Sequence, residues 1–372
     1  MPFAKTESRF PRADVQEQIT VNRLPLSTTT IRGDQYEIGI ELGRLAEQAS
    51  KQVLPRIGRY QDVMRDWLES PRLQLLEAAA RQHFPQHVRT IEGIADGAQM
   101  KFADIFAWNC RGDFPGGGDQ TALAGCTDVM SVCSDKVVMG HNEDDQAELD
   151  GHCWLIDFEP NDGVAYTSFY SPGLLPGHTF GWNAHGLVQT INHIRTHDQA
   201  IGVPRHLLSR AILDCPSLAD AEALIRATPR AGGFHHNLGR FNETPEALSV
   251  EAPATGVSAI ALIANAPRAH ANHLTHPSLQ SVPQTVAPSS AARQLRATEI
   301  CSHGIQSQEQ ARALLADGSN AKLPICRKGA SDQDPGYTLA SATFELTRAH
   351  VRWSVFVDAR TTPDFAGDTP TR

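Results

Sequence analysis

The sequence predicts an α+β protein, in which a mainly helical N-terminal part is followed by a part built mainly of β-hairpins. Apolar residues recur at helical spacing through the first 110 residues, and from position 127 they alternate with polar residues as in strands. Helices and strands do not alternate regularly, which argues against a parallel sheet made of βαβ units. With 372 residues, 41% of them hydrophobic, the chain can bury a sizeable core.

The helical part is expected to begin after a leading arm. Residues 1–30 are polar and lack clear periodicity, so we assign them to that arm. Helices are expected over residues 36–57 with an interruption at Pro55, over 73–82 and over 87–100, followed by the apolar stretch 102–110.

A glycine-rich link at residues 116–118 separates the helical part from the strands. Strands are expected at 127–133, 137–139, 154–158, 165–169 and 259–265, with a hairpin over 179–191 and a final pair at 338–346 and 350–357 before a polar tail. Two amphipathic helices are expected at 207–213 and 218–227, the second capped by Ser217. Residues 278–291 are rich in Ser, Pro and Gln, which predicts a surface loop.

The charge balance excludes some classes of protein. Asp and Glu number 42 against 33 Lys and Arg, a formal charge of −9, and this acidic balance argues against general nucleic-acid binding. No apolar run approaches the ~18 residues of a membrane span, and the N-terminal residues lack the apolar stretch of a signal peptide. The seven cysteines are odd in number, irregularly spaced and without a C-x-x-C pair. This pattern is typical of reduced thiols and not of a disulfide framework. We therefore expect a cytoplasmic protein.

One cysteine has a distinctive position. Cys126 directly follows Gly125, where the glycine-rich link meets an alternating strand. It could be an ordinary strand cysteine, or an N-terminal nucleophile released by self-cleavage, in which its thiol attacks the Gly125 carbonyl. Glycine suits that reaction because a residue without a Cβ leaves the carbonyl open and tolerates strain. Cleavage would give Cys126 a free α-amine with a pKa near 7.7–8.0, which suits a general base.

Eight further motifs occur in order along the chain. They are GDQYEIG at 33–39, IEGIADGA at 91–98, WNCR at 108–111, GHNED at 140–144, GWNAHGL at 181–187, VPRH at 203–206, HANH at 270–273 and PICR at 324–327. Together with Gly125-Cys126-Thr127, they resemble the isopenicillin N acyltransferase family of N-terminal-nucleophile (Ntn) cysteine hydrolases. The resemblance covers roughly residues 30–357. It implies a four-layer αββα sandwich with Cys126 as nucleophile, the mature N-terminus lying at the edge of one sheet.

The resemblance also implies roles for two further catalytic residues. Asn272 matches the family's oxyanion-hole asparagine, whose amide can donate to the negative oxygen of a tetrahedral intermediate; a structural turn asparagine is the alternative. Asp144 matches a family aspartate, and a hairpin would bring it near Cys126, where a carboxylate could orient the new ammonium group. Glu143 and Asp145 beside it leave that choice open, as does a solvated acidic turn.

Three residues are candidates for substrate binding. Asn183 and Asn192 flank a hairpin that the resemblance places near the nucleophile, and turn asparagines are the alternative. Arg327 matches a family arginine that could bind a substrate carboxylate, although a surface salt bridge would explain it equally well.

No metal or cofactor is expected. The histidines His270, His273 and His276 recur at three-residue spacing, which would suit zinc only with further ligands in a defined geometry. The Asn272 match explains this segment without a metal. Cys110 and Cys133 are weaker candidates for a nucleophile, since neither follows a glycine.

These observations predict a self-processing amidohydrolase or acyltransferase, made as a zymogen and cut autocatalytically between Gly125 and Cys126. After the arm at 1–30, residues 31–125 would complete an α chain and 126–372 would form a β chain, both within one Ntn-hydrolase domain. We expect this αβ heterodimer to cleave a small non-peptide or dipeptide-like amide through an acyl-Cys126 intermediate. The alternatives are an acyl-CoA-dependent N-acyltransferase, a non-catalytic ligand-binding protein of this fold, and a metallohydrolase that uses the histidines. Association into a higher oligomer stays open.

Overall fold

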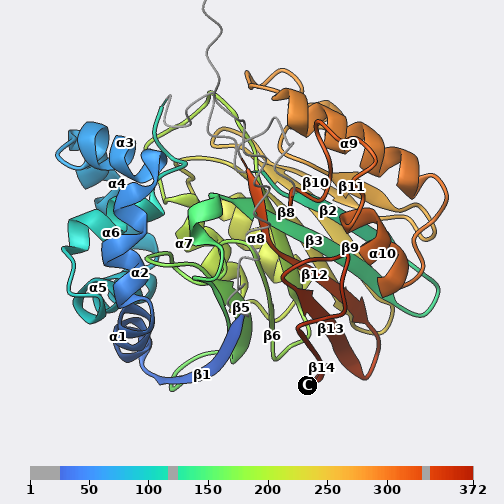
Figure 1. Cartoon of the computed structure of the whole chain (residues 1–372), viewed down its shortest axis with the longest axis horizontal. Helices are drawn as coiled ribbons and strands as arrows, with labels where there is room; N and C mark the ends of the chain where they lie inside the picture. The colour runs from blue at the N-terminus through green and yellow to red at the C-terminus, as the bar shows by residue number, and fades with distance from the viewer. Residues whose placement is uncertain (1–25, 116–124, 329–335, 372) are drawn as a thin grey trace, which may run out of the picture.

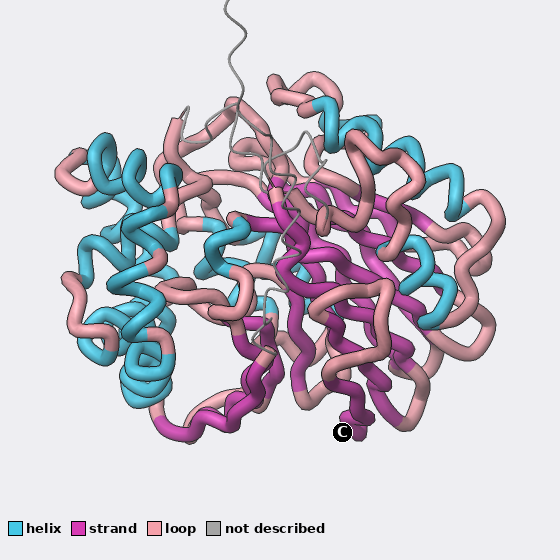
Figure 2. Tube along the Cα trace, in the orientation of Figure 1, coloured by secondary structure: helices cyan, strands magenta, loops and turns pink. Residues whose placement is uncertain are grey.

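The computed structural model describes residues 26–115, 125–328 and 336–371 of the chain. Helices and two β-sheets make up the fold, which confirms the predicted α+β class (Figure 1). The glycine-rich link at 116–118 lies outside the described residues. Figure 2 shows the strands gathered in a central body with helices on both sides of it. Among the described residues, no helix is both long and apolar enough to cross a bilayer.

The helical segment agrees with the prediction except for one additional helix. Its helices are α1 (Gln35–Leu45), α2 (Glu47–Gln52), α3 (Gly58–Trp67), α4 (Pro71–His83), α5 (Pro85–Gly97) and α6 (Phe102–Asn109), with a 3₁₀ turn at Leu54–Arg56. Helix α3 was not predicted. Asp34 caps α1 by accepting from the backbone N–H of Tyr36 and Glu37, at 2.8 and 2.9 Å.

Helices α1 and α5 pack against each other through glycines. A Cβ on Gly39 would lie 2.2 Å from the carbonyl oxygen of Thr90, and one on Gly43 would lie 2.3 Å from that of Ile94. Gly39 belongs to the motif at 33–39, and Gly93 and Gly97 to the motif at 91–98. The glycines in these two motifs are therefore required by helix packing.

One sheet has eight strands in the order β1-β4-β5-β6-β7-β8-β9-β10. They are β1 (Ser27–Gly33), β4 (Trp154–Pro160), β5 (Tyr166–Tyr170), β6 (Phe180–Asn183), β7 (Val188–His193), β8 (Phe234–Phe241), β9 (Pro245–Ala252) and β10 (Ser258–Ala261). Strands β1 and β4 pair in parallel, and the other neighbouring strands described in this sheet are antiparallel. Strand β1 begins inside the predicted arm and was not expected there. This edge strand buries just Ile31 and Gly33, so its sequence shows little apolar alternation.

The other sheet has six antiparallel strands in the order β11-β2-β3-β12-β13-β14. They are β11 (Arg268–His270), β2 (Thr127–Val132), β3 (Val137–Asp145), β12 (Tyr337–Leu346), β13 (His350–Phe356) and β14 (Phe365–Pro370). Strand β14 occupies part of the predicted polar tail. The two sheets touch where β2 meets β7 and β9 and where β3 meets β8.

The remaining helices lie on different sides of the strands. The predicted helices α7 (Arg205–Ile212) and α8 (Leu218–Ala227) are present, and Ser217 caps α8 as expected, its Oγ accepting from the Asp220 N–H at 3.1 Å. Helix α9 (Pro288–Cys301) packs on β11 and β2, and α10 (Gln308–Leu315) packs on β3 and β12. The predicted loop at 278–291 is therefore wrong over its last four residues, because Pro288 opens α9 at a position where a helix accepts proline.

Candidate active site

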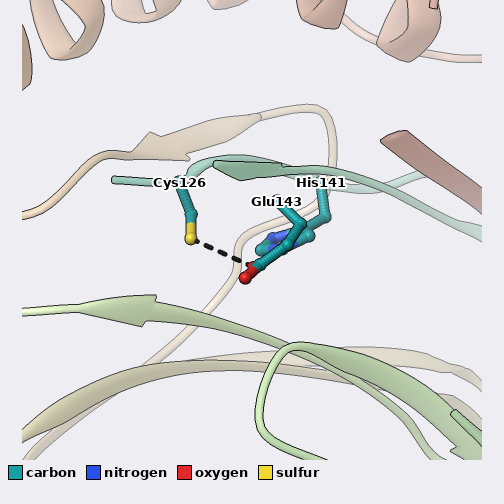
Figure 3. A group of neighbouring side chains, drawn as sticks. All are labelled: Cys126, His141 and Glu143. Atoms are coloured by element: carbon teal, nitrogen blue, oxygen red, sulfur yellow. Dashed lines mark hydrogen bonds and ion pairs between the residues drawn. The ribbon is translucent and has the colours of Figure 1, made fainter. Parts of the chain in front are cut away.

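Cys126 lies immediately before β2, a strand that is paired on both sides, with β11 and with β3. The residue is 7% exposed. Its Sγ atom lies 3.4 Å from Oε2 of Glu143, which comes from β3 (Figure 3). The predicted nucleophile is thus buried with a carboxylate in hydrogen-bonding contact.

Glu143 belongs to a buried polar network. Its Oε2 accepts from Thr179 Oγ1 at 2.5 Å and lies 3.3 Å from Nε2 of His141. His141 Nε2 is also 2.8 Å from Thr179 Oγ1, and its Nδ1 is 2.7 Å from Oδ1 of Asp128. Burial disfavours a charged imidazole, but the contacts with Asp128, Cys126 and Glu143 together outweigh it and raise the pKa of His141 well above its ordinary value. A protonated His141 donates on both sides and fixes Glu143 toward the thiol.

The thiol itself is protonated in this environment. Burial raises the pKa of Cys126 to about 12, and the Glu143 carboxylate adds to the rise while the contact with His141 opposes it. A proton acceptor is therefore required before this sulfur can act as a nucleophile, and Glu143 is in direct contact with it.

Gly125 is enclosed by two polar side chains. A Cβ at this position would lie 2.6 Å from Nη2 of Arg293 and 2.6 Å from Oδ1 of Asn272. A side chain in place of Gly125 would therefore require Arg293 or Asn272 to move away from Cys126.

Arg293 holds this junction together. It comes from α9, is 1% exposed, and donates from Nη1 to the Cys126 carbonyl oxygen at 2.5 Å and to Thr127 Oγ1 at 2.9 Å. Its Nη2 donates to Oδ1 of Asn272 at 2.7 Å, and its Nε donates to Ser289 Oγ at 3.1 Å. The sequence analysis did not identify Arg293. No helix was predicted around it, and nothing in the sequence placed it near Cys126.

The structure brings Asn272 to the Gly125–Cys126 junction. Its Oδ1 faces Arg293, and its Nδ2 donates to the backbone carbonyl of His193 at 3.0 Å. With the amide oxygen accepting from a guanidinium, the amide NH₂ is fixed as the donor end. The amide oxygen is the atom that faces the junction, while the NH₂ group points to the His193 carbonyl, and the oxyanion-hole role of Asn272 stays a prediction.

Asp144 and Arg327 form a buried pair beside the site. Oδ2 of Asp144 lies 3.3 Å from Nη1 of Arg327, and Oδ1 accepts from Thr338 Oγ1 at 2.6 Å. Burial raises the pKa of Asp144 to about 6, against the opposing effect of Arg327 and Arg293. Because Arg327 is 1% exposed, the alternative of a surface salt bridge does not apply. The carboxylate that contacts the thiol is that of Glu143 and not that of Asp144. The sequence had left the choice between these two neighbouring residues open.

The two hairpin asparagines do not line the cavity around Cys126. Asn183 donates to the carbonyls of Leu213 and Cys215 at 3.0 and 2.9 Å, and its Oδ1 accepts from two N–H groups of its own turn. Asn192 donates to the His270 carbonyl at 3.4 Å and lies 3.2 Å from Nδ1 of His235. Both amides are engaged in hydrogen bonds within the protein, Asn183 at its turn and Asn192 within β7, and substrate binding by either residue stays a prediction.

A partly open cavity lies beside Cys126. Gly125, Cys126, Glu143 and Asp144 form part of its wall, and the void measures about 410 Å³ including its mouth. Only about 40 Å³ of this space can hold the centre of a water molecule, so the cavity as it stands has room for a few waters.

The predicted histidines 270, 273 and 276 are engaged within the protein. His270 Nε2 lies 3.0 Å from Glu251, His273 Nδ1 lies 2.8 Å from Ser290 and His276 Nε2 lies 3.1 Å from Ser249. In the part of the chain that the structure describes, the group with metal-ligand spacing is instead Cys126, His141 and Glu143, whose ligand atoms lie within 4.8 Å of one another. Such a set resembles a three-ligand zinc site. The three side chains and Thr179 Oγ1 lie within hydrogen-bonding distance of one another.

Comparison with known proteins identifies the family. The chain is 28% identical to a β-alanyl-dopamine/carcinine hydrolase of Drosophila melanogaster over 215 residues, which span 52% of this chain and 56% of that protein. It is 26% identical to the 40 kDa form of an acyl-coenzyme A:6-aminopenicillanic-acid-acyltransferase of Emericella nidulans over 278 residues, 73% of this chain and 76% of that protein.

A family model gives the strongest evidence. It describes the acyl-coenzyme A:6-aminopenicillanic acid acyl-transferases and matches residues 132–357, a range that contains Glu143, Asp144, Asn272, Arg293 and Arg327. The match confirms the family that the motifs predicted. Because it covers 226 of the 372 residues, the chain belongs to the acyl-coenzyme A:6-aminopenicillanic acid acyl-transferase family.

Proposed function

We propose that this chain is a self-processing Ntn cysteine amidohydrolase that cleaves a small-molecule amide through an acyl-Cys126 intermediate. The observation that carries the proposal is the placement of a buried thiol against Glu143, beside a glycine enclosed by Arg293 and Asn272. Family membership supports it, since the two relatives are a hydrolase and an acyltransferase.

The proposed architecture is the four-layer αββα sandwich of Ntn hydrolases. Its support is the packing: the two sheets touch, α9 and α10 pack on the six-stranded sheet, and α1 packs on β1 and β4 of the eight-stranded sheet. Cys126 then lies where the new N-terminus of β2 would emerge between β11 and β3.

Self-cleavage would proceed in two steps, an acyl shift from nitrogen to sulfur and the hydrolysis of the resulting thioester. Sγ of Cys126 gives its proton to Glu143 and attacks the Gly125 carbonyl carbon; the C–S bond forms, the C–N bond breaks, and the leaving nitrogen takes the proton. Water then hydrolyses the thioester, which leaves a Gly125 carboxylate and a free thiol and amine on Cys126. Glu143 takes the role of base here because the α-amine does not exist before the bond is cut.

Turnover uses the new amine as the base. It takes the thiol proton, the thiolate attacks the substrate carbonyl, and the amine product leaves with a proton. Asn272 donates its amide hydrogen to the tetrahedral oxygen, and water releases the acid. Asp144, buried against Arg327 and lining the same cavity, is the carboxylate proposed to orient the ammonium group.

The substrate class is a small non-peptide or dipeptide-like amide. The Drosophila relative is named for β-alanyl-dopamine and carcinine, so β-alanyl amines are the first amides to test. A second candidate, N-acyl transfer from acyl-CoA, is favoured by the Emericella relative, whose name states that reaction and whose match covers more of both chains. Both candidates use the same acyl-Cys126 intermediate.

Mass spectrometry of the purified chain tests the proposal. We expect two fragments of 125 and 247 residues that stay together, and a single intact chain for Cys126→Ala. The matched control is Cys133→Ala, which changes another buried free cysteine and should leave cleavage unchanged. A wild-type chain that stays intact on long incubation would contradict the proposal. Turnover that survives Cys126→Ala but is abolished by a chelator would indicate a metallohydrolase instead.

A further inference from the structure

Three arginines gather on the wall of the cavity that contains Cys126. Arg59 comes from α3, Arg111 lies two residues beyond the end of α6, and Arg205 opens α7. Their exposed fractions are 7, 6 and 4%. Buried arginines in such a cluster are costly unless something compensates their charge and their donors.

Their hydrogen bonds are incomplete. Among the described residues, Nε of Arg59, Nε and Nη1 of Arg111, and Nε of Arg205 are buried without a hydrogen-bond partner. Arg205 Nη1 makes a short contact with Nδ1 of His193. The other contacts are long: Arg59 Nη2 to the Arg111 carbonyl at 3.3 Å, Arg111 Nη2 to Asp145 Oδ2 at 3.4 Å, and Arg205 Nη1 to the Gly233 carbonyl at 3.2 Å. The donors of all three side chains thus exceed the acceptors that the protein supplies.

Their positive charge is also incompletely neutralised. Burial, together with repulsion from Arg111, lowers the pKa of Arg59 to about 10, although Asp145 opposes the shift. Burial lowers the pKa of Arg205 to about 9, with Arg59 and Arg111 contributing and Asp113 opposing. An anion placed among the three guanidinium groups would relieve both effects.

The arginines are held in place by packing. The Arg111 guanidinium lies 4.6 Å from the ring centroid of Trp108, and that of Arg205 lies 4.2 Å from the ring centroid of Phe234. A Cβ on Gly112 would lie 1.6 Å from Nη2 of Arg205, so this glycine makes room for that side chain. Packed planar guanidinium groups are preorganised for a ligand.

We propose that Arg59, Arg111 and Arg205 form an anion subsite that binds a carboxylate group of the substrate, while its amide carbonyl is presented to Cys126. The inference rests on the proposed function and narrows its substrate class to small amides that carry a carboxylate. β-Alanyl-dopamine and carcinine have no carboxylate, so under this inference both should be poor substrates of this chain. A guanidinium binds a carboxylate through two parallel hydrogen bonds. A singly charged group fits better than a phosphate dianion, because Glu143, Asp144 and Asp145 line the same cavity and would repel the second charge.

Binding to the Cys126→Ala protein tests the subsite without requiring catalysis. The probe is glutarate, measured by calorimetry against its uncharged diamide, glutaramide, and against inorganic phosphate. We expect glutarate to bind at least about tenfold more tightly than either, and Arg111→Gln or Arg205→Gln to weaken glutarate by about tenfold or more. Arg226→Gln, which changes an exposed arginine, should leave binding unchanged.

A second variant guards against misfolding. Arg111→Lys keeps the charge but lacks the planar fork, so glutarate should bind it with intermediate affinity, with circular dichroism confirming a folded protein. The subsite is refuted if folded protein does not bind glutarate, if glutaramide binds equally well, or if the arginine variants bind glutarate normally. Tighter binding of phosphate would refute the preference for a carboxylate. An uncut wild-type chain would refute self-processing instead, so the two failures are distinguishable.

Discussion

Sγ of Cys126 lies 3.4 Å from Oε2 of Glu143. In the proposed chemistry this contact serves self-cleavage and is not needed for turnover. Before cleavage the nitrogen of Cys126 is an amide and has no basic lone pair, so a side chain must accept the thiol proton. After cleavage the α-amine is present and Glu143 is no longer required as base. The predictions below use this difference.

Glu143→Gln should slow self-cleavage by about 100- to 10 000-fold, the range typical of a lost general base. Once the variant is cut, its turnover per active site should fall much less. The half-time of fragment formation on gels and the kcat of the cut protein measure the two effects. Glu148→Gln, on an exposed glutamate, is the control. Equal losses in cleavage and turnover would contradict a role specific to processing.

Gly125→Ala should prevent or strongly slow cleavage. The added Cβ would lie 2.6 Å from both Arg293 Nη2 and Asn272 Oδ1, so these side chains or the backbone must move away from the junction. Gly318→Ala is the matched control, because a Cβ there meets nothing within 4 Å. The fraction of intact chain, determined by mass spectrometry, is the readout, and cleavage at the wild-type rate would count against the geometry.

Arg293→Met should destabilise the protein by about 2–3 kcal/mol, because it leaves the Cys126 carbonyl and Oδ1 of Asn272 buried without their charged donor. Urea denaturation of the uncut Cys126→Ala chain measures this loss separately from cleavage. Arg226→Met removes an exposed arginine, 49% accessible in its side chain, and should change stability little. A similar loss in both variants would show that the buried network is not the cause.

Asn272→Ala should lower kcat of the cut enzyme by about 100- to 1000-fold, the loss expected for one oxyanion donor. The KM should change little, since this interaction forms mainly in the transition state. Steady-state kinetics with the best amide substrate provides both values. A change confined to KM would assign Asn272 to substrate binding instead.

The stability of the protein should fall as the pH drops below about 6.5, in part because of buried His236. Burial, with Arg230 nearby, lowers the pKa of His236 to about 3, so the folded chain stays neutral there while the unfolded chain binds a proton. From pH 7 to pH 5 this residue contributes a loss of about 2 kcal/mol in unfolding free energy. Urea denaturation at both pH values should show a smaller loss for His236→Gln, whereas exposed His303→Gln should behave as wild type.

Much of the fold was predictable because periodicity reports burial. The helices near 36–57, 73–82 and 87–100 and most of the hairpins were expected correctly. Strands β1, β8, β9, β11 and β14 and helices α3, α9 and α10 were missed. Edge strand β1 buries few side chains, and the polar residues 278–291 hide the start of α9. Those elements depend on tertiary contacts that a local pattern does not contain.

The candidate site was predictable in part for a similar reason. Gly125 and Cys126 stand out locally, and the structure places Asn272 beside them. His141 and Glu143 share one face of β3 by strand alternation, a signal that was available in the motif at 140–144. Arg293, 167 residues from Cys126, gives no such signal, and neither does Arg59. Arg111 and Arg205 do stand in the motifs at 108–111 and 203–206, but nothing in the sequence places them on one cavity.

The parallel pairing of β1 with β4 has a consequence for the cut protein. Strand β1 lies before position 125 and β4 lies after it, so hydrogen bonds over Ser27–Gly33 tie one peptide into the sheet of the other. Once severed, the halves should copurify and separate only when the whole molecule is denatured. Cleavage would thus create a free amine at Cys126 while the two peptides stay joined in one folded structure.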